Sequence, residues 1–366
     1  MADYEQLAAF LATDPDNAAL IADTARAALD AGRPTEAAVL AARHRALDGP
    51  SPAMDHVIGL AAMAAGDWTG AVAAFGALNA AGIAATGIGY NLAWSHAMLG
   101  QHDDAIALLN DDVVADLPQA AQLLIGLLHD RGDIDRAEAV ARAAFDRFPD
   151  HVGVNAVIST LAIDIEDLDL AGAAASRAGD HPDALVTRGT LAMDDSDPQA
   201  ASALFDAALA VRADHPRALV GRGLLALNAQ DPAAASWLDR GAEAFGSHPG
   251  SWIAAGWAHL LAGNAADARV RFDRALAIDD RFAEAQGSLA VLDILAGDVV
   301  GGRRRAVIAR RLDPASFSAA LAAAMLAAGD GDAAAVERIV GLALTTPIDD
   351  GGTTIAQALA RMGGPG

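Results

Sequence analysis

The stretch that decides the fold occurs twice: ALVTRGTLA runs from Ala184 to Ala192, and ALVGRGLLA runs from Ala218 to Ala226. The two stretches differ at two positions and begin 34 residues apart. A chain that repeats itself at such an interval is expected to fold as an array of similar units, each of which buries its apolar face against its neighbours.

The same interval runs along the chain. A helix-breaking position followed by an acidic or polar residue recurs every 30–34 residues, at Gly32, Gly66, Gly100, Gly132, Glu166, Ser196, Gln230, Gly263, Gly297 and Gly329. Prolines mark the ends of the units, at Pro15, Pro118, Pro149, Pro182, Pro216, Pro249, Pro314 and Pro347. Glycine suits a tight turn between two helices, and proline suits the first turn of the next helix. The pattern therefore predicts a series of helical hairpins.

Small and aromatic residues keep fixed offsets inside a unit. Gly256 precedes Gly263 by seven residues, and Ala268 precedes Phe272 by four; the pairs Ala71/Phe75 and Ala201/Phe205 repeat the second spacing. A small residue where two helices cross, with an aromatic one turn later, allows close helix packing. Together with Trp252 and the terminal prolines, these residues resemble the tetratricopeptide repeat, of bacterial type. The resemblance implies an all-α, right-handed superhelical solenoid of antiparallel helix pairs.

On that template the chain divides into three parts. Residues 1–17 are expected to form a half-repeat helix, residues 18–348 about ten repeats, and residues 349–366 a capping helix, near Thr353–Met362, with a tail. The ten repeats are predicted at 18–51, 52–85, 86–117, 118–151, 152–181, 182–215, 216–248, 249–282, 283–314 and 315–348. Repeat five has 30 residues and Glu166 at its turn, so we expect it to depart furthest from the pattern and the array to kink there.

The chain is strongly acidic, with a net charge of −23, and all 25 of its basic residues are arginine. Residues 1–180 hold 26 acids and 9 arginines, whereas residues 181–366 hold 22 acids and 16 arginines. No arginine lies between Arg45 and Arg131, a window with nine aspartates. Such a surface repels nucleic acid and anionic lipid and attracts a basic partner. The alternative is that the charge serves solubility alone.

The composition also excludes several kinds of site. The lack of cysteine excludes disulfides and thiolate metal sites, and the lack of lysine excludes a Walker-type nucleotide site. Three histidines, His181, His215 and His248, occupy equivalent corners of successive repeats, too far apart to share a zinc ion. The acidic turn 164–169 is expected to be a solvated loop, with cation binding as the alternative. We therefore predict no catalytic residue, no metal and no cofactor, and a protein that is not an enzyme.

The sequence also predicts the cellular location of the protein. No stretch of about 18 apolar residues is present, so no membrane insertion is expected. The first residues do not resemble a secretory signal, which favours the cytoplasm.

The arginine run Gly301–Arg311 is expected to pair with neighbouring aspartates, with an anion or an acidic peptide as the alternative partner.

In the tetratricopeptide family the first helices of the hairpins line a concave groove. Carried over to this chain, the resemblance implies a mostly apolar stripe that includes Ile163, Thr190, Met193, Arg217, Val220 and Leu224. The best candidates for the site are His56, Leu60, Met63, Tyr90, Asn91, Trp94, Gln122, His129 and Trp257. Aromatic anchors in an acidic setting favour a basic, amphipathic helix of another protein as the partner. Without lysine, the version of this fold that clamps a terminal carboxylate is disfavoured.

The resemblance thus implies a scaffold or adaptor for protein–protein interaction. Two alternatives remain open. In one, the same side chains pack within the array or between subunits, and the protein is a self-assembling structural solenoid. In the other, the protein is an accessory or regulatory subunit of an enzyme.

Overall fold

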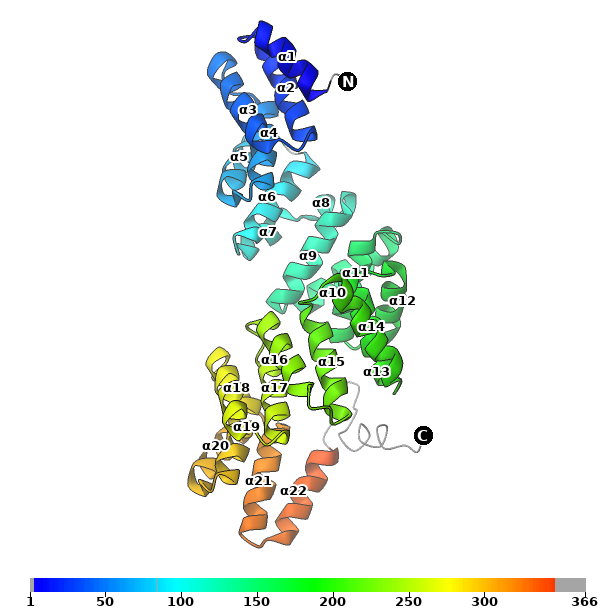
Figure 1. Ribbon diagram of the computed structural model, residues 1–366, viewed down its shortest axis with the longest axis vertical. Helices are drawn as coiled ribbons and strands as arrows, with labels where there is room; N and C mark the ends of the chain where they lie inside the picture. Colours follow the sequence, from blue (N-terminus) through cyan, green and yellow to red (C-terminus); the bar gives the residue numbers. More distant parts are fainter. Residues whose placement is uncertain (1–2, 84, 346–366) are drawn as a thin grey trace. The chain divides into compact units, whose positions relative to one another are not determined.

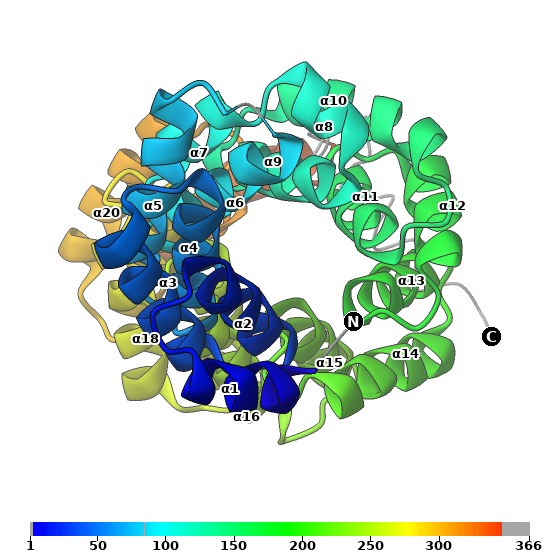
Figure 2. The same ribbon diagram turned by 90° about the horizontal axis from the view of Figure 1, so that it is seen from above.

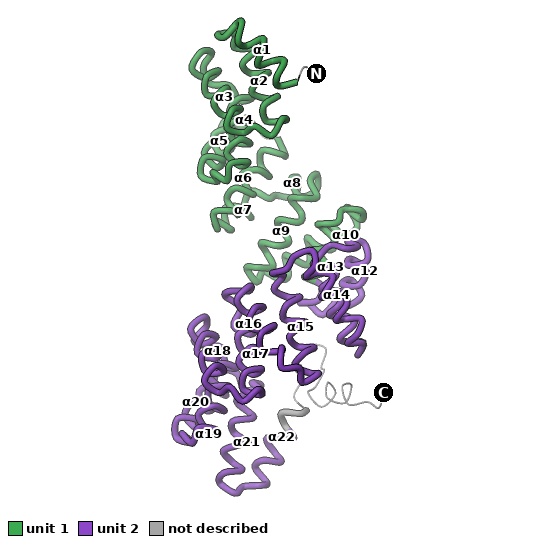
Figure 3. Tube along the Cα trace, in the orientation of Figure 1, with its two compact units in different colours: residues 1–161 green, residues 162–366 purple. Residues whose placement is uncertain are grey.

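The chain is an array of antiparallel helices. The computed structural model describes residues 3–83 and 85–345, which form 22 helices and no strand (Figure 1). The array divides into two compact units, unit 1 (residues 1–161) and unit 2 (residues 162–366), and the division falls inside a helix (Figure 3). The predicted fold class, all-α with repeated helix pairs, is confirmed.

Unit 1 contains α1 (Tyr4–Thr13), α2 (Ala18–Asp30), α3 (Pro34–Asp48), α4 (Pro52–Ala64), α5 (Trp68–Ala80), α6 (Thr86–Met98), α7 (His102–Leu108), α8 (Asp111–Asp116), α9 (Pro118–Arg131), α10 (Ile134–Arg147) and most of α11 (Val152–Asp164).

Unit 2 contains α12 (Leu168–Ala178), α13 (Pro182–Asp194), α14 (Pro198–Val211), α15 (Pro216–Asn228), α16 (Ala234–Phe245), α17 (Pro249–Leu261), α18 (Ala265–Ile278), α19 (Ala283–Leu295), α20 (Val299–Leu312), α21 (Phe317–Gly329) and α22 (Ala333–Thr345). Within this unit, Figure 2 shows the first helices α13 and α15 on the inner side of their curve and the second helices α14 and α16 on the outer side.

A single turn geometry joins the two helices of nearly every hairpin. After α2, the N–H of Gly32 donates to the carbonyl of Leu29, and the N–H of Arg33 donates to the carbonyl of Ala28. Gly32 is left-handed, with φ +69°, and this conformation closes the helix by satisfying its last carbonyls. The residue after the left-handed position often caps the next helix, as Asp67 does by accepting the N–H of Gly70.

The predicted turn positions adopt this conformation with one exception. Even Glu166, Ser196 and Gln230 are left-handed, with φ between +54° and +60°. Gly329 was expected at the last turn, but it is the final residue of α21, and Gly331 takes the left-handed conformation with φ +76°. The helix α21 therefore ends two residues later than the spacing of the turn residues in the sequence predicts.

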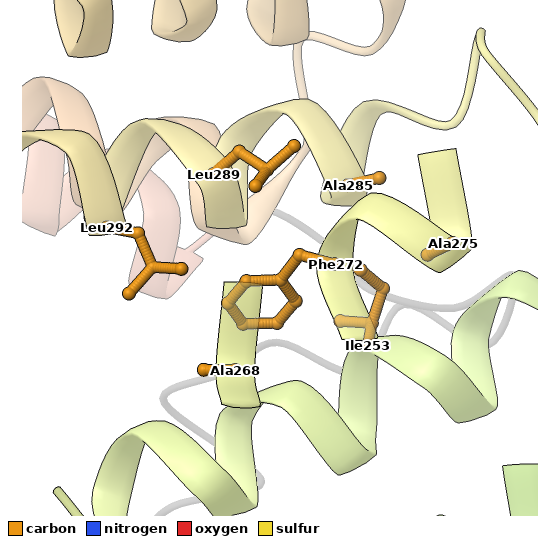
Figure 4. Close-up of a cluster of buried hydrophobic side chains, with 7 residues drawn as sticks. All are labelled: Ile253, Ala268, Phe272, Ala275, Ala285, Leu289 and Leu292. Carbon is orange, nitrogen blue, oxygen red and sulfur yellow. The ribbon is translucent and has the colours of Figure 1, made fainter. Parts of the chain in front are cut away.

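The aromatic residue of the second helix packs onto the first helix. A Cβ atom on Gly256 would lie 2.3 Å from Cε1 of Phe272, so the ring fills the space that the missing side chain leaves. Figure 4 shows Phe272 among the side chains of the same cluster, which are Ile253, Ala268, Ala275, Ala285, Leu289 and Leu292. Gly59 and Phe75 repeat this contact in unit 1.

The largest departure from the pattern is in repeat three, not in repeat five as expected. Repeat five keeps the ordinary turn, in which Asp167 accepts the N–H of Leu170, and differs by a second helix of only 11 residues. In repeat three the second helix is broken into α7 and α8. Asn110 starts α8 because its side chain accepts the N–H of Val113 at 3.1 Å.

The sequence also predicts a helix at each end of the chain. The helix α1 lies in the segment 1–17 that was expected to hold a half-repeat helix, and it packs on α2. The capping helix expected near Thr353–Met362 lies outside the described residues.

Candidate functional site

Two aromatic residues of the predicted groove stand one turn apart on α6. The ring centroids of Tyr90 and Trp94 are 6.2 Å apart, with an angle of 46° between the ring planes. Both side chains are half-buried, and burial raises the pKa of the Tyr90 phenol, which keeps it a neutral hydroxyl donor. The pair forms a rigid surface that is apolar with a polar edge, the kind of anchor that often dominates a protein interface.

Three predicted groove residues of α4 are partly used by the core. Leu60 and Met63 pack against the buried cluster that contains Phe75 and Leu92. The ring of His56 meets Phe75 edge-on at 5.8 Å, and burial lowers the pKa of His56. These side chains therefore support the fold at least as much as they line a groove.

The remaining candidates of unit 1 are polar and half-buried. Asn91 follows Tyr90 on α6, and His129 lies in the last turn of α9. The amide of Gln122 covers the backbone of α11, since a Cβ atom on Gly153 would lie 2.3 Å from its Oε1. Unit 1 thus holds eight of the nine candidates, among which Tyr90 and Trp94 are in direct ring contact.

The ninth candidate, Trp257, lies in unit 2 and is engaged in packing. Its ring meets Phe272 in a T-shaped contact at 5.8 Å. It also packs against the buried clusters that contain Leu289 and Ala322, so it joins two successive repeats. In the structure, then, Trp257 is a core residue with one half-exposed face.

A hollow of about 480 Å³ opens on the first helices of unit 2. It is lined by Thr190 and Met193 from α13, by Arg217, Val220, Gly221 and Leu224 from α15, and by Gly250, Ser251 and Ala254 from α17, together with Ile163, Phe205, Phe245 and His248. Six of these residues belong to the stripe that the family resemblance implied. The hollow itself was not predicted, because it depends on how three helices pack against one another.

The rim of this hollow is polar, but its arginine is paired with a carboxylate and its histidine is neutral. Arg217 donates two hydrogen bonds to the carboxylate of Asp164, at 3.0 and 2.6 Å. Burial, assisted by the positive charge of Arg217, lowers the pKa of His248, which keeps its imidazole neutral near pH 7. The hollow therefore suits an uncharged apolar side chain of a partner better than an ion.

His248 makes the stability of unit 2 depend on pH. Its Nδ1 accepts the N–H of Ser251 at 3.1 Å and so caps α17. Because its pKa is lower in the folded chain, the unfolded chain binds a proton first as the pH falls. Stability is then complete above the unfolded pKa of about 6.5 and is lost as the pH falls towards the folded value.

We expect His248→Asn to remove this loss, since asparagine caps a helix equally well but does not titrate. The measurement is urea unfolding of both chains between about pH 7.5 and 5, where one linked proton contributes at most about 1.4 kcal/mol per pH unit. His102→Asn, at an exposed position on α7, is the matched control. Equal pH slopes in the wild type and in His248→Asn would contradict this account.

Charge is distributed over both units. Unit 1 carries 21 acids and 8 arginines, and unit 2 carries 27 acids and 17 arginines. Within residues 3–83 and 85–345, no three histidine, aspartate or glutamate side chains come together in a way that could hold a metal ion. In the same residues, no helix has the length and apolar character that crossing a membrane requires.

Comparison with known proteins gives a family match for two segments and a similar fold for the chain. The family model described as "Tetratricopeptide repeat" matches residues 56–121 and 186–251. No curated protein matches the chain. Among solved structures, a monomeric mutant of IFIT1 with m7Gppp-AAAA matches over 89% of this chain and 87% of its own, with 10% identity and a TM-score of 0.57.

Two shorter solved structures are also similar. PilF of Pseudomonas aeruginosa covers 57% of this chain and 96% of its own, with 17% identity and a TM-score of 0.44. PilW, described as a type IV pilus biogenesis factor, covers 55% of this chain and 96% of its own, with 18% identity and a TM-score of 0.45. At 10% identity, the likeness to IFIT1 is one of fold alone. The two matched segments are therefore tetratricopeptide repeats, and similar helical hairpins recur through the rest of the described chain.

Proposed function

We propose that this protein is a non-catalytic scaffold that binds a basic, amphipathic segment of another protein. Proteins built from tetratricopeptide repeats generally mediate protein–protein interaction. One observation carries the proposal: in both units, half-exposed apolar side chains that helix packing has not buried lie on the first helices. The Tyr90–Trp94 pair is such a surface in unit 1, and the hollow across α13, α15 and α17 is another in unit 2.

The charge of the chain supports the choice of partner. A surface with an excess of 23 negative charges attracts a basic segment and repels nucleic acid. We therefore propose no nucleic-acid ligand, since the likeness to IFIT1, whose structure holds m7Gppp-AAAA, is one of fold alone. We propose that Tyr90 and Trp94 anchor the apolar side of the partner, while the aspartates of residues 46–130 attract its basic side.

Tyr90→Ala/Trp94→Ala is expected to weaken partner binding at least tenfold, because the variant removes both aromatic anchors from one surface. The experiment is capture of partners from native lysate on immobilised wild-type and variant chains, at moderate and high salt. Each captured protein is then purified, and its dissociation constant is measured with both chains. The matched control is Val39→Ala/Leu47→Ala, which removes two exposed apolar side chains from the second helix α3.

Circular dichroism must first show that all chains are equally helical. A partner that binds the wild type and the control, loses affinity for the aromatic variant and weakens with salt supports the proposal. If one partner bound the wild type and the aromatic variant with equal affinity, the binding surface would lie elsewhere. This result would contradict the proposed role of Tyr90 and Trp94.

A further inference from the structure

The helix α20 is the most basic part of the described chain. It carries five arginines and no acid over residues 299–312. The expected pairing with aspartates occurs at Arg303, which binds Asp330 at 2.8 Å, and at Arg305, which binds Asp293 at 2.9 Å. Within residues 3–83 and 85–345, the other three arginines of the helix, Arg304, Arg310 and Arg311, have no ion pair.

Two of these arginines share one exposed face of α20 with two valines. Val300, Arg304, Val307 and Arg311 follow each other at spacings of four, three and four residues, so they lie within one narrow arc of the helix. Val300 is 83% exposed and Val307 is 39% exposed. We call these four residues the basic ridge. The basic ridge therefore presents apolar side chains and positive charges next to each other on one face of the helix.

Unit 1 contains a hollow of opposite character, which the broken helix of repeat three creates. It has a volume of about 610 Å³ and lies between α8 and α10. Val114, Ala139, Val140 and Ala143 form its apolar floor, and the exposed Asp111 and Asp146 stand at its rim. We call these six residues the acid-rimmed hollow.

The one arginine in the lining of this hollow is already engaged. Arg147 donates from Nε to the carbonyl of Ala115, and its guanidinium lies 6.0 Å from the centre of the Phe148 ring. Asp112 and Asp116, on the same short helix as Asp111, are exposed and add to the negative charge near the hollow. The hollow thus suits a surface that presents apolar and positively charged side chains next to each other.

The basic ridge has that chemistry, and we propose that α20 of one copy of this chain docks in the acid-rimmed hollow of a second copy. Val300 and Val307, about 10 Å apart along the helix, would enter the apolar floor. Arg304 and Arg311 would meet the carboxylates of Asp111 and Asp146. Elsewhere, two copies with a charge of −23 each repel one another, so this pairing of opposite charges selects both the face and the register.

The contact uses second helices on both sides, because α8, α10 and α20 all belong to the second halves of their hairpins. It therefore goes beyond the proposed function and leaves the first helices open to another partner. Since the ridge and the hollow are different surfaces, the contact is heterologous and propagates into chains or rings. One helix seated against two others makes a small interface, so we expect a dissociation constant on the order of micromolar that weakens with salt.

The test is sedimentation velocity of the full-length chain over a range of micromolar concentrations, at low and high salt. The wild type is expected to exceed the mass of a dimer at low salt and to dissociate at high salt. The ridge variant Arg304→Glu/Arg311→Glu and the hollow variant Asp111→Arg/Asp146→Arg are each expected to associate at least tenfold more weakly. The control Arg212→Glu/Arg281→Glu makes the same charge change at two exposed arginines of unit 2 off the ridge and should behave as the wild type.

Mixing the two interface variants gives the sharpest outcome. The intact hollow of the ridge variant can accept the intact ridge of the hollow variant, so the mixture is expected to form complexes that neither chain forms alone. A wild type that stays monomeric at low salt would overturn the proposal. So would a hollow variant that associates as the wild type does, or a mixture of the two variants that stays monomeric. These outcomes leave binding at Tyr90 and Trp94 untouched, so the two proposals fail separately.

Discussion

Phe205→Ala is expected to lower the free energy of unfolding in unit 2 by about 3–5 kcal/mol, the cost of deleting a fully buried ring. Phe205 is 1% exposed and serves two repeats at once. A Cβ atom on Gly189 would lie 2.7 Å from its Cε1, and one on Gly221 would lie 2.5 Å from its Cζ. Removal of the ring thus opens a cavity where the first helices α13 and α15 meet the second helix between them.

A single unfolding midpoint does not describe a long repeat array well, because neighbouring repeats can unfold separately. The measurement is therefore hydrogen exchange of the amides in α13, α14 and α15, compared between the wild type and the variant. Phe10→Ala, at a site that is 52% exposed, is the control and should change local stability by less than about 0.5 kcal/mol. A loss of protection in the Phe205 variant worth under about 1 kcal/mol would contradict the described packing.

Gly287→Ala is the second substitution with a large expected effect. It is expected to lower the free energy of unfolding by about 1–3 kcal/mol because the added methyl group overpacks the site. The added methyl group would lie 2.6 Å from the backbone nitrogen of Ala319 and 2.7 Å from Cβ of Ser318. Because its neighbours are largely backbone, no flexible side chain can move aside, and α21 must shift away from α19. The shift also strains the buried contact between the hydroxyls of Ser288 and Ser318, which are 3.1 Å apart.

Gly126→Ala is the matched control and is expected to have the opposite sign. Gly126 lies inside α9, and no heavy atom of another part of the chain lies within 4 Å of its added Cβ. Alanine at such a position stabilises a helix by about 0.5–1 kcal/mol. Hydrogen exchange of the amides in α9, α19 and α21, compared between each variant and the wild type, checks the pair. If Gly287→Ala were as stable as the wild type, the close approach of α19 and α21 would be wrong.

The sequence predicted the hairpins well because their turns are local. A left-handed residue followed by a helix cap needs only a few neighbouring residues, and the period predicted even Glu166 and Ser196 correctly. The error at Gly329 arose because Gly331, two residues later, fits the same pattern. Helix packing rather than local sequence decides which of two such glycines ends the helix.

The site was less predictable because one set of helix positions serves two purposes. The family template places Leu60, Met63 and Trp257 on the groove side, yet in the structure all three pack against core clusters. The hollow across α13, α15 and α17 and the break at Asn110 depend on how the helices pack and on where a helix stops short. Such features follow from three-dimensional packing, which a positional template does not contain.

The arrangement of the hairpins also bears on how the chain folds. Among the described helices, substantial contacts join only nearest or next-nearest neighbours along the chain, as in α19 with α20 and α21. The polypeptide therefore never has to bring distant segments together, and its relative contact order is low. We expect folding to begin at any stable hairpin and to spread outward, with no obligatory nucleus. A damaged repeat would then slow the folding of its neighbours only. The emerging chain would be able to fold on the ribosome one hairpin at a time.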